Sequence, residues 1–311
     1  MIKQSFDKNY SVLTFATNDQ RYLKFAFNCA RSILLFNDID IYIVTNVETA
    51  IPNDIINNVF LLPAQTAHAK LGVGMKLYMD TYLQTQHSLF IDSDCLCFGS
   101  LKPIFTACAG KDIAVVGNIV ASASWCGDEQ AEIIKDNFGI DKLIRFNGGL
   151  YYMQKTPGTE QIFDKARAIA DKYDDYHFAR INGKWMNEEG PLSIAMMLHS
   201  QQPIADNGTY MTDLFTDIQP DKLNVLKGVS TLSNPAPLSP RHREWYPEKT
   251  YSPIIIHFGG GNLKTYRYIS QSVLLKLNSI GIPDRLSILI TDVIIKIPVK
   301  GIKWLLSVFR N

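Results

Sequence analysis

The sequence predicts an α/β fold with a mostly parallel central sheet flanked by helices. Two observations predict it: short apolar runs of strand length alternate with segments of helical periodicity, and an acidic triplet directly follows one of these runs. The chain has 311 residues, of which 46% are hydrophobic and 20% charged, which is enough for one large domain of this class.

The first half of the chain carries the clearer alternation. Buried parallel strands read as continuous apolar runs, whereas amphipathic helices repeat their apolar residues every three to four positions. By these criteria, the predicted strands are residues 12–16, 39–44, 59–62, 88–91 and 113–116, and the predicted helices are residues 19–36, 52–58 and 70–85.

The second half is less regular. Residues 234–253 hold five of the 14 prolines, which predicts irregular structure there. The predicted strands of this half are residues 146–153 and 254–258, and its predicted helices are residues 159–173 and 187–199.

Composition narrows the functions to consider. The formal net charge of +1 gives no overall attraction to nucleic acid, so no nucleic-acid partner is expected. The five cysteines form no zinc-type spacing, and Cys95 and Cys97 are expected to be small buried residues on one face of a strand. The N-terminus lacks an apolar signal segment, and no apolar run reaches about 18 residues, so a cytoplasmic location is expected.

The triplet Asp92-Ser93-Asp94 directly follows the predicted strand at residues 88–91. Ligands of such sheets bind beyond the carboxyl ends of the strands. Two carboxylates and two diphosphate oxygens suit a hard divalent cation, which removes their mutual repulsion and stabilises charge on a leaving diphosphate. The alternative is that the triplet is a solvated loop or a capping turn.

His257 ends a late apolar run and is followed by Gly259-Gly260-Gly261 and Lys264. A histidine nitrogen can complete a manganese site. Glycine lets backbone N–H groups approach phosphate closely, and a lysine supplies a positive charge. The alternatives are a core histidine and a plain glycine loop.

Two further stretches are candidate sugar contacts. Asn147 can hydrogen-bond hydroxyl groups, and it precedes Gly148-Gly149 within a predicted strand, where glycine often marks close approach of a ligand or backbone. Glu188 and Glu189 open a predicted helix, where one carboxylate could bind hydroxyls or stabilise positive charge at an anomeric carbon. The alternatives are a bulged strand and acidic residues placed to favour the helix dipole.

These stretches, in this order, resemble glycosyltransferase family 8 and its GT-A-fold relatives, whose central sheet is Rossmann-like. The resemblance covers residues 11–264, which is most of the chain. Its motifs are residues 15–18 (FATN) with Tyr22, Lys76, residues 89–94 (LFIDSD), residues 146–150 (FNGGL), residues 189–192 (EGPL), and His257-Phe258 with Gly260 and Lys264.

The resemblance implies a role for each matching residue. The metal ligands would be Asp92, Asp94 and His257, holding Mn²⁺ or, as the alternative, Mg²⁺. The residues acting at the donor sugar would be Glu189, Glu188 and Asn147. The donor-binding residues would be Phe15, Ala16, Thr17, Tyr22, Lys76, Ser93, Asn147, Gly148, Gly260 and Lys264.

The sequence departs from the family pattern at two places. Glu188-Glu189-Gly190-Pro191 stands where the family has an acidic-glutamine or acidic-acidic stretch, so which glutamate faces the sugar is left open. Thr265-Tyr266 replaces the common Pro-Trp, so the lid over the diphosphate is expected to differ. Family 8 enzymes retain anomeric configuration, and here a short-lived ion pair is favoured over a covalent carboxylate intermediate.

The predicted function is transfer of a hexose from a UDP-sugar to a glycan or lipid-linked acceptor of the polysaccharide or lipopolysaccharide type. One alternative is a sugar-nucleotide pyrophosphorylase, which is disfavoured because residues 17–21 (TNDQR) lack the glycine-rich loop of those enzymes. The other alternative is a non-catalytic nucleotide-sugar-binding module.

The C-terminal segment, residues 282–311, is predicted to be distinct from a transferase domain at residues 1–281. Pro298 is expected to split or kink it. A basic amphipathic helix bearing Trp and Phe favours an anionic membrane surface, here the inner face, and the alternative is a helix packed on the domain. One side of the predicted helix carries Lys300, Lys303, Ser307 and Arg310, and the other carries Ile302, Leu305, Leu306 and Phe309.

Overall fold

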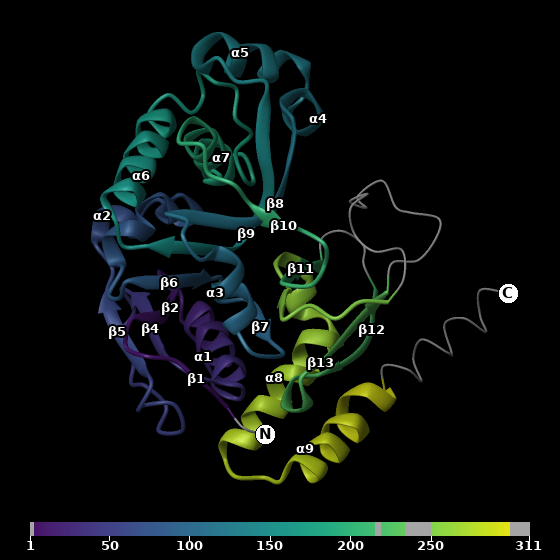
Figure 1. Ribbon diagram of the computed structural model, residues 1–311. Coiled ribbons are helices and arrows are strands. Elements are labelled where there is room, and N and C mark those ends of the chain that lie inside the picture. The colour runs from purple at the N-terminus through teal and green to yellow at the C-terminus, as the bar shows by residue number, and fades with distance from the viewer. Residues whose placement is uncertain (1–2, 215–218, 234–249, 299–311) are drawn as a thin grey trace, which may run out of the picture.

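A seven-stranded sheet forms the centre of the structure, a computed structural model that describes residues 3–214, 219–233 and 250–298 (Figure 1). Neighbouring strands in this sheet run parallel, except that β9 is antiparallel to both of its neighbours. The strand order is β10 (Ile204–Ala205), β8 (Ile113–Ala121), β9 (Lys142–Gln154), β6 (His87–Ile91), β2 (Tyr10–Phe15), β4 (Asp40–Thr45) and β5 (Val59–Pro63). The predicted α/β class with a mostly parallel sheet is confirmed.

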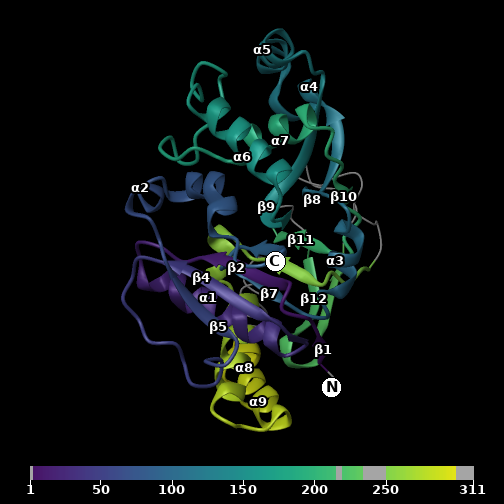
Figure 2. The same cartoon turned by 60° about the vertical axis from the view of Figure 1, so that its left-hand side comes forward.

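Helices cover both faces of this sheet because its strands are apolar on both sides. Successive residues of a strand point to opposite faces. Val12 and Leu89 therefore pack toward α1 (Gln20–Leu34) and α3 (Lys102–Cys108). Leu13 and Phe90 pack toward the opposite layer (Figure 2). That layer contains the 3₁₀ helix η1 (Gly72–Tyr82), α6 (Pro157–Ala170) and α7 (Glu189–Leu198).

Helix α1 shows how local sequence places an element. The Asp19 side chain accepts a hydrogen bond from the Arg21 backbone N–H, which caps the first turn. Its buried residues Leu23, Ala26 and Ile33 recur at helical spacing and cover the sheet. The helix begins at Gln20 and ends at Leu34, close to the predicted bounds of 19–36.

A second, three-stranded sheet lies beside the central one. Its order is β11 (Met211–Asp213), β14 (Ile255–His257) and β7 (Cys95–Cys97), with β14 parallel to β11 and antiparallel to β7. Leu96 and Ile256 join a third core cluster with α8 (Tyr266–Ser279). The remaining paired strands are β1 (Gln4–Ser5) with β3 (Asn37–Asp38) and β12 (Gln219–Asn224) with β13 (Val229–Ser233).

Two predicted helices differ in the structure. Residues 52–58 form consecutive turns, with Ile55 N–H bonded to the Pro52 carbonyl, rather than a helix. The predicted helix at 70–85 is replaced by η1, which is kinked at Tyr78 and follows the short helix α2 (Thr66–Ala69). Gly72 and Gly74 weaken α-helix in this stretch, and Gly72 has a φ of 60°.

The other helices are α4 (Ser122–Cys126), α5 (Asp128–Phe138), η3 (Val225–Lys227), η4 (Gly260–Lys264), α9 (Asp284–Thr291) and the π-helical η5 (Asp292–Lys296).

The C-terminal part of the described chain is helical. Helix α9 packs against α8 at one end of the molecule (Figure 1). Among the described residues, no helix combines the length and apolar character needed to cross a membrane. The predicted two-sided helix at residues 300–310 and most of the predicted irregular stretch at 234–253 lie outside the described residues.

Candidate active site

A cleft of about 420 Å³ opens at the carboxyl ends of β2 and β6. This is the edge at which ligands bind in parallel α/β sheets. The segment from Ile181 to Trp185, joined by a β-bridge between those two residues, forms the opposite wall. The residues that line the cleft are Phe15, Thr17, Asn18, Tyr22, Gly72, Val73, Met75, Lys76, Asp92, Ser93, Asp94, Ile181, Asn182 and Trp185.

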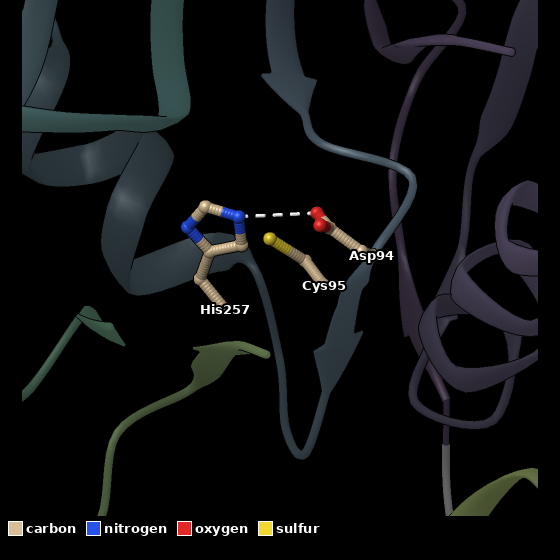
Figure 3. Close-up of side chains that lie close together, drawn as sticks. All are labelled: Asp94, Cys95 and His257. Carbon is tan, nitrogen blue, oxygen red and sulfur yellow. Dashed lines mark ion pairs between the residues drawn. The ribbon is translucent and has the colours of Figure 1, made fainter. Parts of the chain in front are cut away.

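The two aspartates of the triplet converge on His257 at the floor of this cleft. The His257 Nε2 atom lies 3.1 Å from Asp94 Oδ1 (Figure 3). The same atom lies 3.8 Å from Asp92 Oδ2. Metal–nitrogen and metal–oxygen bonds of about 2.0 to 2.2 Å span such separations. Asp94 and His257 are therefore close enough to bind one divalent ion, whereas Asp92 Oδ2 is held by Lys76 Nζ at 2.6 Å and would have to leave the lysine to join them.

The register of the small sheet brings His257 to this point. Residue Cys95 in β7 pairs directly with His257 in β14, and His257 pairs with Asp213 in β11. Asn147 completes the arrangement: its Oδ1 lies 2.7 Å from His257 Nδ1, and its Nδ2 donates to Asp213 Oδ2 at 3.3 Å. The Nδ1–H of His257 thus donates to Asn147, which directs Nε2 toward the two aspartates.

Lys76 joins the two aspartates of the triplet to the glutamate pair. Its Nζ lies 2.6 Å from Asp92 Oδ2 and 3.3 Å from Glu188 Oε1, and it donates to the Gly148 carbonyl at 2.8 Å. Burial opposes the charged form of Lys76, but Asp92 and Glu188 outweigh burial and raise its pKa. The lysine is therefore a fixed positive charge between three buried or half-buried acidic side chains, Asp92, Asp94 and Glu188.

The glycine pair of β9 allows the strand to pass between Glu188 and His257. A Cβ atom at Gly148 would meet Glu188 Oε1, and one at Gly149 would lie 2.8 Å from His257 Nδ1. Because side chains of a strand alternate, each glycine leaves room on a different face. The close backbone approach predicted for Gly148-Gly149 is present, and protein side chains occupy the space.

The two glutamates have different surroundings. Glu188 is 1% exposed, and its Oε1 accepts from the Tyr151 hydroxyl at 2.9 Å. Glu189 is half-buried at the start of α7, and its Oε1 accepts from the Gly148 N–H at 2.7 Å. Burial and the neighbouring Glu188 raise the pKa of Glu189 to about 7.

The pKa values of His257, Asp92 and Asp94 depend on burial and on the charges beside them. Burial disfavours a charged His257, but Asp94 and Asp92 outweigh burial and raise its pKa to about 9. For Asp92, burial prevails over Lys76 and raises the pKa, whereas for Asp94 the nearby His257 prevails over burial and lowers it. Lys76 and protonated His257 thus supply positive charge that a bound cation would supply instead.

The predicted site residues fall into four groups. Phe15, Thr17, Tyr22, Lys76, Ser93 and the two aspartates line the cleft, and His257, Asn147, Gly148 and the glutamates form its supporting layer. Ala16 is buried in the core. Gly260 and Lys264 follow β14 in η4, where Lys264 is exposed and does not line the cleft.

Several site residues were not predicted. Asp213 and Tyr151 lie in runs without a recognisable motif, and only the packing of β11 and β9 brings them to the site. Trp185 lies over Gly72, where a Cβ would be 2.7 Å from its ring. The available signal for this contact is the glycine within a stretch of helical periodicity, which does not identify the partner.

The architecture matches the GT-A fold of solved glycosyltransferase structures. No protein-family model matches the sequence, and no curated protein sequence matches it significantly. Membership of family 8 therefore stays a prediction.

The solved structures that the chain resembles include the galactosyltransferase LgtC in complex with donor and acceptor sugar analogs, with 13% identity and a TM-score of 0.51 over 80% of this chain and 87% of that one. The bifunctional glycosyltransferase WbbM has 12% identity and a TM-score of 0.53 over 92% of this chain and 52% of that one. These likenesses show the fold.

Proposed function

We propose that the protein is a metal-dependent glycosyltransferase that moves a hexose from a UDP-sugar to a glycan or lipid-linked acceptor. The observation that carries the proposal is that Asp92 and Asp94 line a cleft in a GT-A fold and lie 3.8 and 3.1 Å from His257 Nε2. An acidic pair with a histidine nitrogen is a suitable donor set for Mn²⁺ and also for Mg²⁺.

The donor is proposed to occupy the cleft. Asp92, Asp94 and His257 would hold the ion, which when bound stabilises negative charge on the leaving diphosphate. Phe15 and Tyr22 line the part of the cleft at the end of β2 and offer aromatic surface to a nucleotide base. Thr17 and Ser93 offer hydroxyl groups in the same cleft. Gly260 and Lys264 lie directly after His257, and closure of this segment over the diphosphate is part of the proposal.

Glu189 is proposed as the carboxylate that faces the donor sugar. Glu188 is committed to Lys76 and Tyr151 and is almost fully buried, whereas Glu189 is half-buried beside Gly148. We assign Glu189 to binding sugar hydroxyls and to stabilising positive charge at the anomeric carbon. This assignment is compatible with retention of configuration through a short-lived ion pair, since the hydrogen bond from Gly148 N–H fixes the carboxylate in place.

Attachment to an anionic membrane surface is the second part of the proposal. Helix α9 and η5 present large exposed apolar side chains at helical spacing, and Arg285 is exposed beside them. Exposed apolar surface of this kind is typical of interaction sites. A peripheral site on the inner face of the membrane would suit a lipid-linked acceptor. The exposed apolar residues are Leu286, Leu289, Val293, Ile294 and Ile297.

Calorimetric titration with UDP, with and without Mn²⁺, tests the donor site. We expect tight UDP binding that requires Mn²⁺ and is lost in Asp92→Ala and in the isosteric Asp94→Asn variant. Asp136→Ala, an exposed position on α5, is the matched control and should bind like the wild type. Metal-independent binding, or binding unchanged by the site variants, would show that the triplet is only a turn.

Turnover is tested separately from binding. Slow Mn²⁺-dependent hydrolysis of a UDP-hexose would exclude a non-catalytic nucleotide-sugar-binding module. Tight Mn²⁺-dependent UDP binding without hydrolysis or transfer to any acceptor would favour that module instead.

A further inference from the structure

A cysteine thiol lies beside the proposed metal ligands. Cys95 is directly opposite His257 in the antiparallel pair of β7 and β14, so the two side chains share one face of the small sheet. Figure 3 shows its sulfur directed toward the space between the His257 imidazole and the Asp94 carboxylate. Cys95 is 0% exposed, which confirms its predicted burial. Its sulfur nevertheless lies near two polar groups, the Asp94 carboxylate and the His257 imidazole.

The three donor atoms are close enough to bind one ion together. An Asp94 oxygen, the Cys95 sulfur and a His257 nitrogen all lie within 4.8 Å of one another. Tetrahedral zinc bonds of about 2.0 to 2.3 Å place ligand atoms roughly 3.3 to 3.6 Å apart. Contraction of about 1 Å, available through side-chain rotation, would form such a site.

The chemistry of this set differs from that of the carboxylate pair. Thiolate sulfur is a soft ligand that favours Zn²⁺ and Cd²⁺, whereas Mn²⁺ and Mg²⁺ favour oxygen. The Cys95 Sγ lies 3.7 Å from the Gly149 carbonyl, so the thiol has only a weak, long hydrogen bond to hold it when no ion is bound. Binding of a soft ion would replace the thiol proton, which leaves to solvent, and no electron transfer is involved.

We propose that Asp94, Cys95 and His257 form a thiolate site for a soft divalent ion that overlaps the hard-ion site and competes with Mn²⁺ for it. The two sites share Asp94 and His257, so they cannot be filled at once. The competition with Mn²⁺ rests on the proposed function, but the thiolate site does not. An ion held by fully buried Cys95 lies further from the cleft than one held by Asp92 and Asp94, which both line it.

Titration of the full chain with Cd²⁺ tests the thiolate site. Cadmium bound to thiolate gives a near-ultraviolet charge-transfer band that oxygen and nitrogen ligands do not give. We expect this band on addition of one equivalent of Cd²⁺, and we expect Cys95→Val and Cys95→Ala to abolish it. The matched control is Cys97→Val, because Cys97 is a buried cysteine on the same face of the same strand. No band in the wild type, or a band unchanged by both Cys95 variants, would overturn the proposal.

Competition is measured by the release of Mn²⁺, which regains its solution electron paramagnetic resonance signal when it leaves the protein. We expect Zn²⁺ to release Mn²⁺ from the wild type at a concentration about tenfold lower than from Cys95→Val. Equal release from both proteins would refute the competition. If neither the wild type nor Cys95→Val binds Mn²⁺, the proposed function is contradicted. The cadmium band would still decide whether the thiolate site exists.

Discussion

At the scale of single residues, burial and a neighbouring carboxylate raise the pKa of Glu189. It lies beside a second carboxylate, Glu188, and both approach the Gly148 backbone. Only one positive side chain, Lys76, is within ion-pair distance of Glu188 among the described residues, and Lys76 also pairs with Asp92. Glu188 is buried and Glu189 is half-buried, and Lys76 must also neutralise Asp92. Ionising both glutamates is therefore costly.

The raised pKa of Glu189 should make the free energy of unfolding depend on pH. The pKa of Glu189 is about 7 in the folded protein against an ordinary value of 4.5. The folded state therefore binds this proton more tightly, so its stabilising contribution is complete below about 4.5 and is lost as pH rises through about 7. Relative to Glu189→Gln, the wild type should lose on the order of 1 to 3 kcal/mol of unfolding free energy across this window.

Urea unfolding at a series of pH values measures this difference. Glu160→Gln, at an exposed position in the first turn of α6, is the control and should follow the wild type. Parallel profiles for the wild type and Glu189→Gln between pH 5 and pH 7 would mean that Glu189 titrates as it does in the unfolded chain.

At the scale of secondary-structure elements, the three-stranded sheet fixes the histidine of the site. Asp213, His257 and Cys95 form a row across β11, β14 and β7, and Asn147 from β9 bridges Asp213 and His257. A metal-ligating histidine commonly donates its other N–H to such a partner, and loss of that partner weakens metal binding by about 10- to 100-fold. We therefore expect Asp213 to act as a positioning residue through Asn147.

Replacement of Asp213 tests this arrangement. We expect Asp213→Ala to lower Mn²⁺ affinity by about tenfold, because Asn147 loses its acceptor and no longer orients His257. Asp213→Asn keeps an acceptor oxygen and should remain near the wild type. The readout is Mn²⁺ binding by electron paramagnetic resonance, with thermal unfolding as a check of the fold. Wild-type affinity in a folded Asp213→Ala protein would exclude a positioning role.

The elements also show why the sequence predicts part of the site and misses the rest. Asp92 and Asp94 are predictable because a buried strand places whatever follows it at the binding edge. Lys76 is predicted as a site residue, but its element is 3₁₀ rather than α-helical because Gly72 adopts a positive φ beneath Trp185. Asp213 is not predictable, since its approach to Asn147 depends on the register of strands far apart in sequence.

At the scale of the whole molecule, the C-terminal helices leave a row of large apolar side chains exposed and bury two polar ones. Ser287 and Thr291 of α9 are 0% exposed, whereas Leu289 and Ile294 are 58% and 67% exposed. A helix that packs only on its own domain normally buries its apolar face. Here Ser287 and Thr291 lie on the inner side of α9 together with Ile288, which packs against the core residues of α8. The outer side carries Leu286 and Leu289, so the fold leaves an apolar strip for another surface.

Vesicle sedimentation of the full chain tests whether that surface is an anionic membrane. We expect the wild type to sediment with vesicles containing anionic lipid, and less so at high salt, because basic residues contribute through screened attraction. Substituting Leu286, Leu289 and Val293 together by Gln should release the protein, as should deletion of residues 282–311. The matched control is Ile56→Gln, since Ile56 is an apolar residue exposed by 50% in the turns at 52–58. If the triple variant and the truncated protein both sediment like the wild type, the strip contacts something other than lipid, and the membrane part of the proposed function is refuted while the donor site is unaffected.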